Sequence, residues 1–123
     1  MKKIESDKAP QAVGPYSQAI DAGDFVYLSG QLGIDRQTGR MAEGIEGQTQ
    51  QAFINISYVL EEAGLTLDNV VKVLVLLNDI KDFAKVNEIY AQKFSEPFPA
   101  RSAFAVAALP LGGLVEIEVI AKK

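Results

Sequence analysis

Two side-chain types that carry much of enzyme chemistry are absent from this chain of 123 residues, which has no cysteine and no histidine. The missing cysteines exclude disulfides, thiolate nucleophiles, cysteine-based zinc sites and thiol redox chemistry. The missing histidines remove the commonest general base, the commonest metal ligand and every Ser–His or Cys–His nucleophile pair. Any catalysis must therefore use carboxylates, lysine, arginine, tyrosine, hydroxyl groups, backbone groups or water.

Long hydrophobic runs and an excess of positive charge are also missing. No uninterrupted apolar run comes near the length that a bilayer requires, and no apolar segment follows Met1, Lys2 and Lys3 as it would in a signal peptide. The formal net charge is -4 and the pI about 4.8, which argues against nucleic acid or an anionic membrane as the main partner. We therefore expect a cytoplasmic protein that binds neither nucleic acid nor membrane.

The remaining composition is ordinary for a globular protein. Apolar residues make up 48% of the chain and charged residues 23%. A chain of this length can bury one real hydrophobic core. Since it has no internal repeat, linker or low-complexity segment, we predict a single domain over residues 1–123.

Hydrophobic periodicity predicts two helices. Residues 48–63 form the first, because their apolar residues recur at spacings of three and four. Gly64 is suited to end this helix in the left-handed conformation, and Leu65 can fold back over its last turn. Residues 83–94 form the second helix. Its predicted buried stripe also includes one amide, and it consists of Phe83, Val86, Asn87, Tyr90 and Phe94.

Alternating and β-branched segments predict the strands, at residues 4–5, 16–20, 25–30, 70–77, 100–106 and 115–121. Residues 33–44 are predicted as a polar loop with room for a short strand near Met41. This order of elements predicts an α+β sandwich with two helices on one face of a sheet. Residues 70–77 and 25–28 are nevertheless apolar on both faces, so the face without helices would be a large exposed apolar patch. We infer that other copies of the chain bury that face.

Arg101 is the residue that most needs an explanation, because the predicted strand around it is apolar and buried. A guanidinium cannot be deprotonated, and burying one without a partner is costly. Arg101 therefore either pairs with an acidic side chain inside the protein or binds an anion from outside. The candidate partner is Glu116, which shares one face of the next predicted strand with Glu118. From these residues alone, a structural Arg101–Glu116 ion pair is the favoured interpretation.

Four segments together resemble the reactive intermediate deaminase family (Rid, or YjgF-like) of enamine/imine deaminases. They are GPYSQA at 14–19, LSGQ at 28–31, DFAKVNEIY at 82–90, and PARS at 99–102 with VEIE at 115–118. The resemblance covers residues 9–122. It implies a chorismate-mutase-like α+β sandwich, with a mixed, mostly antiparallel sheet and two helices on one face. It also implies a homotrimer with sites in the clefts between subunits, and neither a cofactor nor a metal.

The activity implied by this resemblance is hydrolysis of 2-imino acids to 2-keto acids and ammonia. 2-Iminobutanoate and 2-iminopropanoate, formed by pyridoxal-phosphate dehydratases from threonine and serine, are the implied substrates. Arg101 matches the family's arginine that grips the substrate carboxylate, and Glu116 matches the glutamate that orients the attacking water. We expect a nearby Arg101 to favour the ionised form of Glu116.

The resemblance also assigns substrate-binding positions, which are Tyr16, Ser29, Gly30, Asn87 and Ala103. Many family members have a cysteine where this chain has Ala103, so only backbone groups can serve there. Ser29 has no base beside it, which argues against a nucleophilic role. Asn87 either ties its helix to the sheet or contacts substrate, and the two interpretations are about equally supported.

Two other functions remain open at this level. One is a regulatory trimer that binds 2-keto acids without turnover. The other is an endoribonuclease or translation inhibitor, an activity reported for some relatives. The absence of histidine and the negative net charge both disfavour the ribonuclease.

Overall fold

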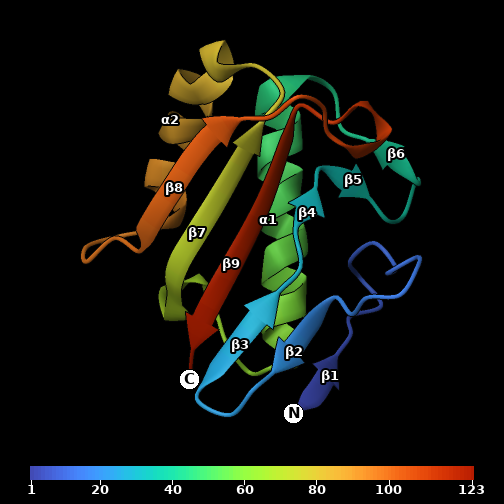
Figure 1. Cartoon of the computed structure of the whole chain (residues 1–123), viewed down its shortest axis with the longest axis vertical. Coiled ribbons are helices and arrows are strands. Elements are labelled where there is room, and N and C mark those ends of the chain that lie inside the picture. Colours follow the sequence, from blue (N-terminus) through green and yellow to red (C-terminus); the bar gives the residue numbers. More distant parts are fainter.

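A seven-stranded sheet with two helices behind it forms the protein, and the computed structural model describes all residues, Met1–Lys123 (Figure 1). The strand order is β1-β2-β3-β9-β7-β8, and β4 also pairs with β9. Every pairing is antiparallel except that of β7 with β8. The main-sheet strands are β1 (Lys2–Ile4), β2 (Ala19–Asp21), β3 (Phe25–Leu28), β4 (Gln31–Leu32), β7 (Val70–Leu77), β8 (Ala100–Ala105) and β9 (Val115–Lys122).

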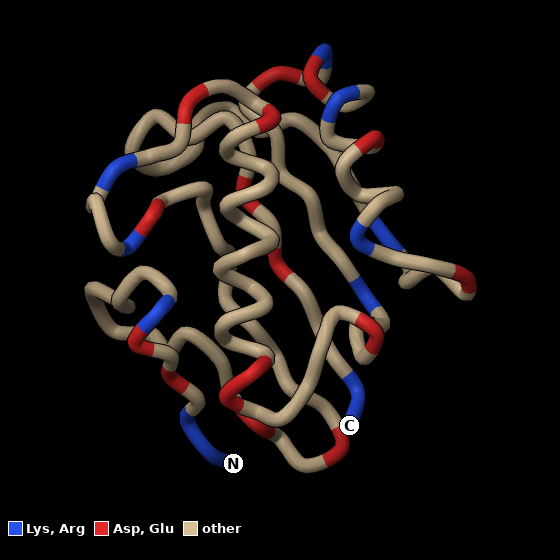
Figure 2. The backbone as a smooth tube through the Cα atoms, turned by 180° about the vertical axis from the view of Figure 1, so that it is seen from behind, with Lys and Arg blue, Asp and Glu red and all other residues tan.

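The remaining elements are a small hairpin, the two α-helices and three short 3-10 helices at Leu67–Asn69, Ile80–Asp82 and Pro110–Gly112. The hairpin pairs β5 (Ile34–Asp35) with β6 (Arg40–Met41), and the helices are α1 (Gly44–Glu62) and α2 (Phe83–Lys93). Neither helix is long and apolar enough to cross a membrane. Seen from the helix side, Lys and Arg are scattered among Asp and Glu rather than gathered over one element (Figure 2). The predicted α+β sandwich, with a mixed, mostly antiparallel sheet, is confirmed.

Helix α1 ends as its sequence predicts but begins earlier. Gly64 has a φ of 72°, and the N–H of Leu65 donates to the carbonyl of Leu60 at 2.9 Å, which closes the last turn. The start lies at Gly44, whereas the periodicity predicted residue 48. Ile45 is buried, and its packing on the core stabilises an additional first turn although that turn contains two glycines.

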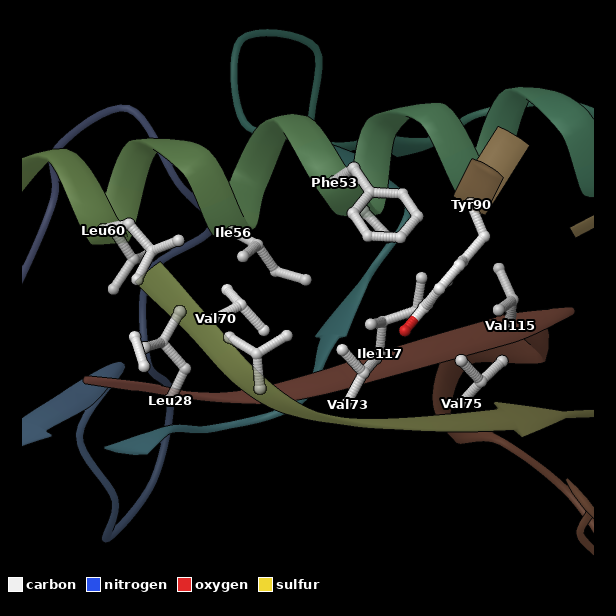
Figure 3. Packing of buried hydrophobic residues seen from close by; sticks show 14 of the residues in the cluster. Leu28, Phe53, Ile56, Leu60, Val70, Val73, Val75, Tyr90, Val115 and Ile117 are labelled. Carbon is white, nitrogen blue, oxygen red and sulfur yellow. The ribbon is translucent and has the colours of Figure 1, made fainter. Parts of the chain in front are cut away.

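The core fills the space between α1 and one face of the sheet (Figure 3). Buried residues of α1, Phe53 and Ile56 among them, pack over Val73 and Val75 of β7 and over Ile117 of β9. Buried residues recur along both strands and face α1, whereas the residues between them are half-buried apart from exposed Val71 and Lys122. The two strands are therefore covered on one face only within the protomer.

The other face of the sheet carries exposed apolar side chains, and we call it the open face. Tyr27 is 47% exposed and Phe104 49% exposed, and half-buried Leu74, Leu76 and Ile120 lie between them in the sheet register. Figure 1 views the molecule from this side. The sequence predicted such an uncovered apolar face.

Strand β8 differs from its prediction as a buried strand. It forms an edge of the sheet and pairs only with β7. All of its residues are exposed except half-buried Ala103. An apolar composition could not reveal this position, because an edge strand that another copy of the chain covers has the same composition as a core strand.

Candidate active site

Arg101 lies on the helix-covered side of β8, beside α2. Its Nη1 donates to Oδ1 of Asn87 at 2.6 Å. Its guanidinium carbon lies 4.6 Å from the ring centre of Tyr90 and 5.1 Å from that of Phe83. The two ion pairs of the protomer, Lys3–Glu5 and Lys123–Asp21, do not include it. Arg101 is thus held by neutral partners and keeps an uncompensated positive charge.

Two sequence predictions about this region were wrong. The strand around Arg101 was predicted to be buried and Asn87 to lie on the buried stripe of its helix, but Arg101 and Asn87 are both exposed in the protomer. Val86, Tyr90 and Phe94 of the stripe are buried as predicted, whereas Phe83 is half-buried. Ala103 lies two residues along β8 on the same face as Arg101, where it packs against the core.

A groove of about 560 Å³ opens beside Arg101 and Asn87, and its other lining residues are Glu88, Tyr90, Ala91, Phe98 and Pro99. That volume lies in the range typical of small-molecule sites. Its walls carry the Arg101 cation, the Asn87 amide, the Glu88 carboxylate and apolar groups, and the cation is suited to a small ligand with one carboxylate. We call Arg101, Asn87 and Ala103 the arginine half-site.

Glu116 lies on the open face, against a glycine. A Cβ atom added to Gly30 would stand 2.9 Å from Cδ and 3.0 Å from Oε2 of Glu116, so the carboxylate rests directly over this residue. The approach is possible because the chain bulges between β3 and β4. From Tyr27 to Gln31 the chain advances four residues, while their partners Ile120 and Ile117 are three apart. Such a one-residue β-bulge is a common device for aiming groups at a functional site.

Ser29 and Tyr16 belong to the same region as Glu116. The Ser29 hydroxyl donates to the Ser17 carbonyl at 2.6 Å, and the Ser29 N–H donates to the Gln18 carbonyl at 2.9 Å. These bonds fix the chain next to Tyr16 beside the bulge, while the Tyr16 ring itself is 55% exposed. Ser29 thus has a carbonyl and no base as its partner, in agreement with the argument against a nucleophile. We call Tyr16, Ser29, Gly30 and Glu116 the glutamate half-site.

Polar residues of α1 support this bulge from behind. The Asn55 side chain donates to the carbonyls of Leu32 and Ile34 at 3.1 and 2.8 Å. Gln48 accepts the N–H of Leu114, the residue before β9, at 2.8 Å. Gly33 allows close contact, since a Cβ there would lie 2.5 Å from the Gln48 backbone. These contacts fix the positions of β4 and of the start of β9, and therefore the position of the Glu116 backbone.

The pKa of Glu116 is raised in the protomer. Burial raises the pKa of its carboxyl group, and the neighbouring charge of Glu118, on the same face of β9, raises it further. Arg101 does not contribute to this shift. In the protomer Glu116 therefore holds a proton more readily than an ordinary glutamate, and the effect of an Arg101 from another subunit stays a prediction.

The two half-sites lie on opposite faces of the sheet. Strand β7 separates β8 from β9, so the two strands do not adjoin as the sequence suggested. Arg101 pairs in register with Val73, which faces the helices, whereas Glu116 pairs with Leu76, which faces the open side. The predicted structural ion pair between Arg101 and Glu116 does not form in the protomer.

Sequence reasoning missed two aromatic neighbours of Arg101. Phe83 and Tyr90 were assigned only to the core, yet their rings also pack on the guanidinium. Their spacing was the available signal, because Phe83, Asn87 and Tyr90 share one face of α2 with intervals of four and three residues.

No three carboxylates converge to form a metal site.

Comparisons with known proteins give a consistent result. The family model described as Endoribonuclease L-PSP matches residues 6–123. A bovine (Bos taurus) protein named 2-iminobutanoate/2-iminopropanoate deaminase is 51% identical over 98% of this chain and 88% of its own length. A RutC family protein of Pyrococcus horikoshii is 50% identical over 98% of this chain and 96% of its own.

Solved structures agree with these sequence matches. The crystal structure of RidA from the Antarctic bacterium Psychrobacter sp. superposes with a TM-score of 0.97 at 51% identity, covering 100% of both chains. Since these matches span nearly the whole sequence, the chain belongs to the reactive intermediate deaminase (Rid, YjgF-like) family, whose family model is described as Endoribonuclease L-PSP.

Proposed function

We propose that this protein hydrolyses reactive 2-imino acids and their enamine tautomers to 2-keto acids and ammonia. The observation that carries the proposal is the uncompensated guanidinium of Arg101, which pairs with an amide and two rings but with no carboxylate. A guanidinium binds a carboxylate through two parallel hydrogen bonds, and the proposed substrates carry one carboxylate. The names of relatives at about 50% identity support 2-iminobutanoate and 2-iminopropanoate as substrates.

A complete site requires two copies of the chain, because Arg101 and Glu116 lie on opposite faces of one sheet. We therefore propose a homotrimer with its sites in the clefts between subunits. Each subunit contributes its arginine half-site to one cleft and its glutamate half-site to another. The apolar open face supports this assembly, since a monomer would leave Tyr27 and Phe104 in water.

In the proposed reaction, the substrate carboxylate binds the Arg101 fork and the imine carbon lies near Glu116 of the neighbouring copy. Water adds to the carbon of the protonated imine, C=NH2⁺, while the Glu116 carboxylate accepts one water proton, which gives a neutral carbinolamine. Glu116 returns that proton to the amine nitrogen and the C–N bond breaks. Ammonia leaves as the carbonyl forms, and the Glu116 carboxylate accepts the hydroxyl proton and passes it to solvent. The upward direction of the Glu116 pKa in the protomer favours a group that both accepts and returns a proton, because a catalytic acid–base group works best when its pKa approaches the operating pH.

The test couples a threonine dehydratase to this protein and follows 2-ketobutanoate under conditions in which spontaneous imine hydrolysis is slow. Wild type should accelerate the reaction, Arg101→Ala should not, and Glu116→Ala should lower turnover more than binding. Arg36→Ala is the matched control, because Arg36 donates to the Ala9 carbonyl in another part of the protein. Equal rates with and without the protein would overturn the proposal.

A regulatory trimer that binds 2-keto acids without turnover would use the same Arg101 fork. It predicts saturable keto-acid binding that Arg101→Ala abolishes, with no acceleration in the coupled assay. The ribonuclease alternative would require RNA cleavage by a highly purified sample, abolished by a substitution in either half-site. The cytoplasmic location and the absence of nucleic-acid and membrane partners stay predictions from the sequence.

A further inference from the structure

We propose that Phe83, Asn87 and Tyr90 of α2 form a cradle that orients the Arg101 guanidinium and leaves its charge available for a ligand carboxylate. This proposal rests on the proposed function, because it concerns how the same arginine recognises its substrate. It also changes the role of Asn87. The family resemblance makes Asn87 a substrate contact, whereas the geometry makes it a positioning residue that acts through Arg101.

The cradle follows from the helical spacing of its three members. Phe83, Asn87 and Tyr90 project from one face of α2 toward β8. Asn87 Oδ1 accepts one hydrogen bond from Nη1 at 2.6 Å, and the two ring centres lie 4.6 and 5.1 Å from the guanidinium carbon. Guanidinium is planar, with its N–H donors at the edge and its π surface on the faces. The cradle therefore occupies one donor, and the remaining edge donors can bind a carboxylate.

The neutrality of these partners is essential to the proposal. An amide oxygen orients the guanidinium without neutralising it, and the electron-rich face of an aromatic ring stabilises a cation without accepting a hydrogen bond. An aspartate in place of Asn87 would instead form an internal ion pair with the fork. The ligand's carboxylate would then have to displace a carboxylate that the protein itself supplies.

The buried aromatic cluster gives the cradle its rigidity. The Tyr90 ring packs on Phe94 with centroids 4.7 Å apart and meets Phe53 of α1 edge-on at 6.2 Å. Figure 3 shows Tyr90 reaching into the core with its hydroxyl toward Ile117. That hydroxyl is buried without a hydrogen-bond partner, and burial raises its pKa while the charge of Arg101 acts in the opposite direction. The ring is thus the part of Tyr90 that serves Arg101, and the hydroxyl is dispensable.

The experiment compares cradle variants by two readouts and checks their folding by thermal unfolding. Binding of 2-ketobutanoate is measured by NMR titration. Catalytic efficiency, kcat/KM, is measured from the partition of dehydratase-generated imine between the protein and semicarbazide, which traps imines. Tyr90→Leu and Phe83→Leu should each weaken 2-ketobutanoate binding, roughly three- to thirtyfold for the more closely packed Tyr90. Asn87→Asp should weaken it more than tenfold, on the order of a lost charge-assisted bond.

Rescue and control variants separate the cradle from a general effect on packing or charge. Tyr90→Phe keeps the ring and should restore the binding that Tyr90→Leu loses. Tyr58→Leu removes a half-buried ring of α1 that lies near another cation, Lys8. Gln92→Glu adds a negative charge to an exposed position of α2. Both controls should bind 2-ketobutanoate as the wild type does.

Each outcome decides a different claim. If Asn87→Asp, Phe83→Leu and Tyr90→Leu all fold and bind as the controls do, the cradle is wrong even if the deaminase activity is real. If Tyr90→Phe is as weak as Tyr90→Leu, the hydroxyl acts and the cradle is also wrong. If the wild type binds 2-ketobutanoate without accelerating imine hydrolysis, the proposed function fails, and the binding data alone decide the cradle.

Discussion

Arg101 and Glu116 lie on opposite faces of the same sheet, on the two strands that flank β7. A single protomer therefore holds two incomplete half-sites, one with a cation and one with a carboxylate. Their separation means that the proposed sharing of each site between two subunits can be measured directly.

Two inactive variants should restore activity to each other. In an equimolar mixture of Arg101→Ala and Glu116→Ala chains, assembled together from unfolded protein, about a quarter of the clefts should receive both intact residues. The coupled dehydratase assay should then recover roughly that fraction of wild-type activity, whereas each variant assembled alone should stay inactive. Mixing the same variants after separate assembly is the control. No recovery from the co-assembled sample would show that each site belongs to one subunit.

Gly30→Ala should impair catalysis with little loss of stability. The added methyl would lie within 3.0 Å of the end of the Glu116 side chain, a flexible group that can move aside. We expect the displaced carboxylate to lower turnover by about 10²-fold or more, with an unfolding free energy within about 1 kcal/mol of wild type.

Gly33→Ala is the matched comparison for this substitution. There the methyl would meet the Gln48 backbone at 2.5 Å, which cannot yield cheaply. Its unfolding free energy should fall by roughly 1–3 kcal/mol, the usual cost of overpacking. Equal stability losses in the two variants would contradict this account of Gly30.

Glu116→Gln should change the free energy of unfolding relative to wild type by an amount that depends on pH. The pKa of Glu116 is raised in the folded protein, so as the pH rises the unfolded chain loses this proton first. The folded state then binds more protons than the unfolded state, and stability falls with increasing pH until the folded-state pKa is passed. The stability of Glu116→Gln relative to wild type should therefore increase from about pH 4 toward pH 7.

Denaturant unfolding at matched protein concentration measures that difference. Turnover of Glu116→Gln should meanwhile fall about 10²- to 10⁴-fold, the usual contribution of a positioned acid–base group. Glu61→Gln, at an exposed position of α1, is the control. A relative stability that does not change with pH would count against a raised pKa in the assembled protein.

Phe104→Asp should prevent assembly. Phe104 lies on the open face, and a carboxylate there would have to be buried without a partner when copies associate. Sedimentation of the variant at micromolar concentration should give the mass of one chain, with imine hydrolysis lost as well. Ile54→Asp, a 40% exposed position on α1, should leave the assembly intact. A Phe104→Asp protein that still sediments as a trimer would exclude the open face from the interface.

Much of the fold could be predicted because its signals are local. The spacing of Phe53, Ile56 and Leu60 gives α1, and a glycine with positive φ ends that helix. The elements that were missed are those whose residues lack such a signal. Strand β4 has only two residues, and the bulge beside it depends on pairing with β9, which is distant in the sequence.

The site was harder to predict because periodicity does not show whether an apolar residue packs on the core of its own chain or lies at an edge of the sheet. The apolar residues around Arg101 suggested a core strand, while β8 is an edge strand in the protomer. Asn87 shares a helix face with buried residues, yet it lies where that face meets Arg101 instead of the core. Chain order suggested that β8 and β9 are neighbours, but β7 lies between them and pairs with both.

The aromatic contacts of Tyr90 have an evolutionary consequence for Phe53. This α1 residue is fully buried and lies beyond the reach of any ligand, yet its ring supports the ring on which Arg101 packs. A smaller residue at position 53 would loosen that support, so carboxylate affinity would fall together with packing. We therefore expect sequence change at position 53 to be restrained by ligand recognition as well as by folding, and compensating changes are to be sought at Phe94, which contacts both rings.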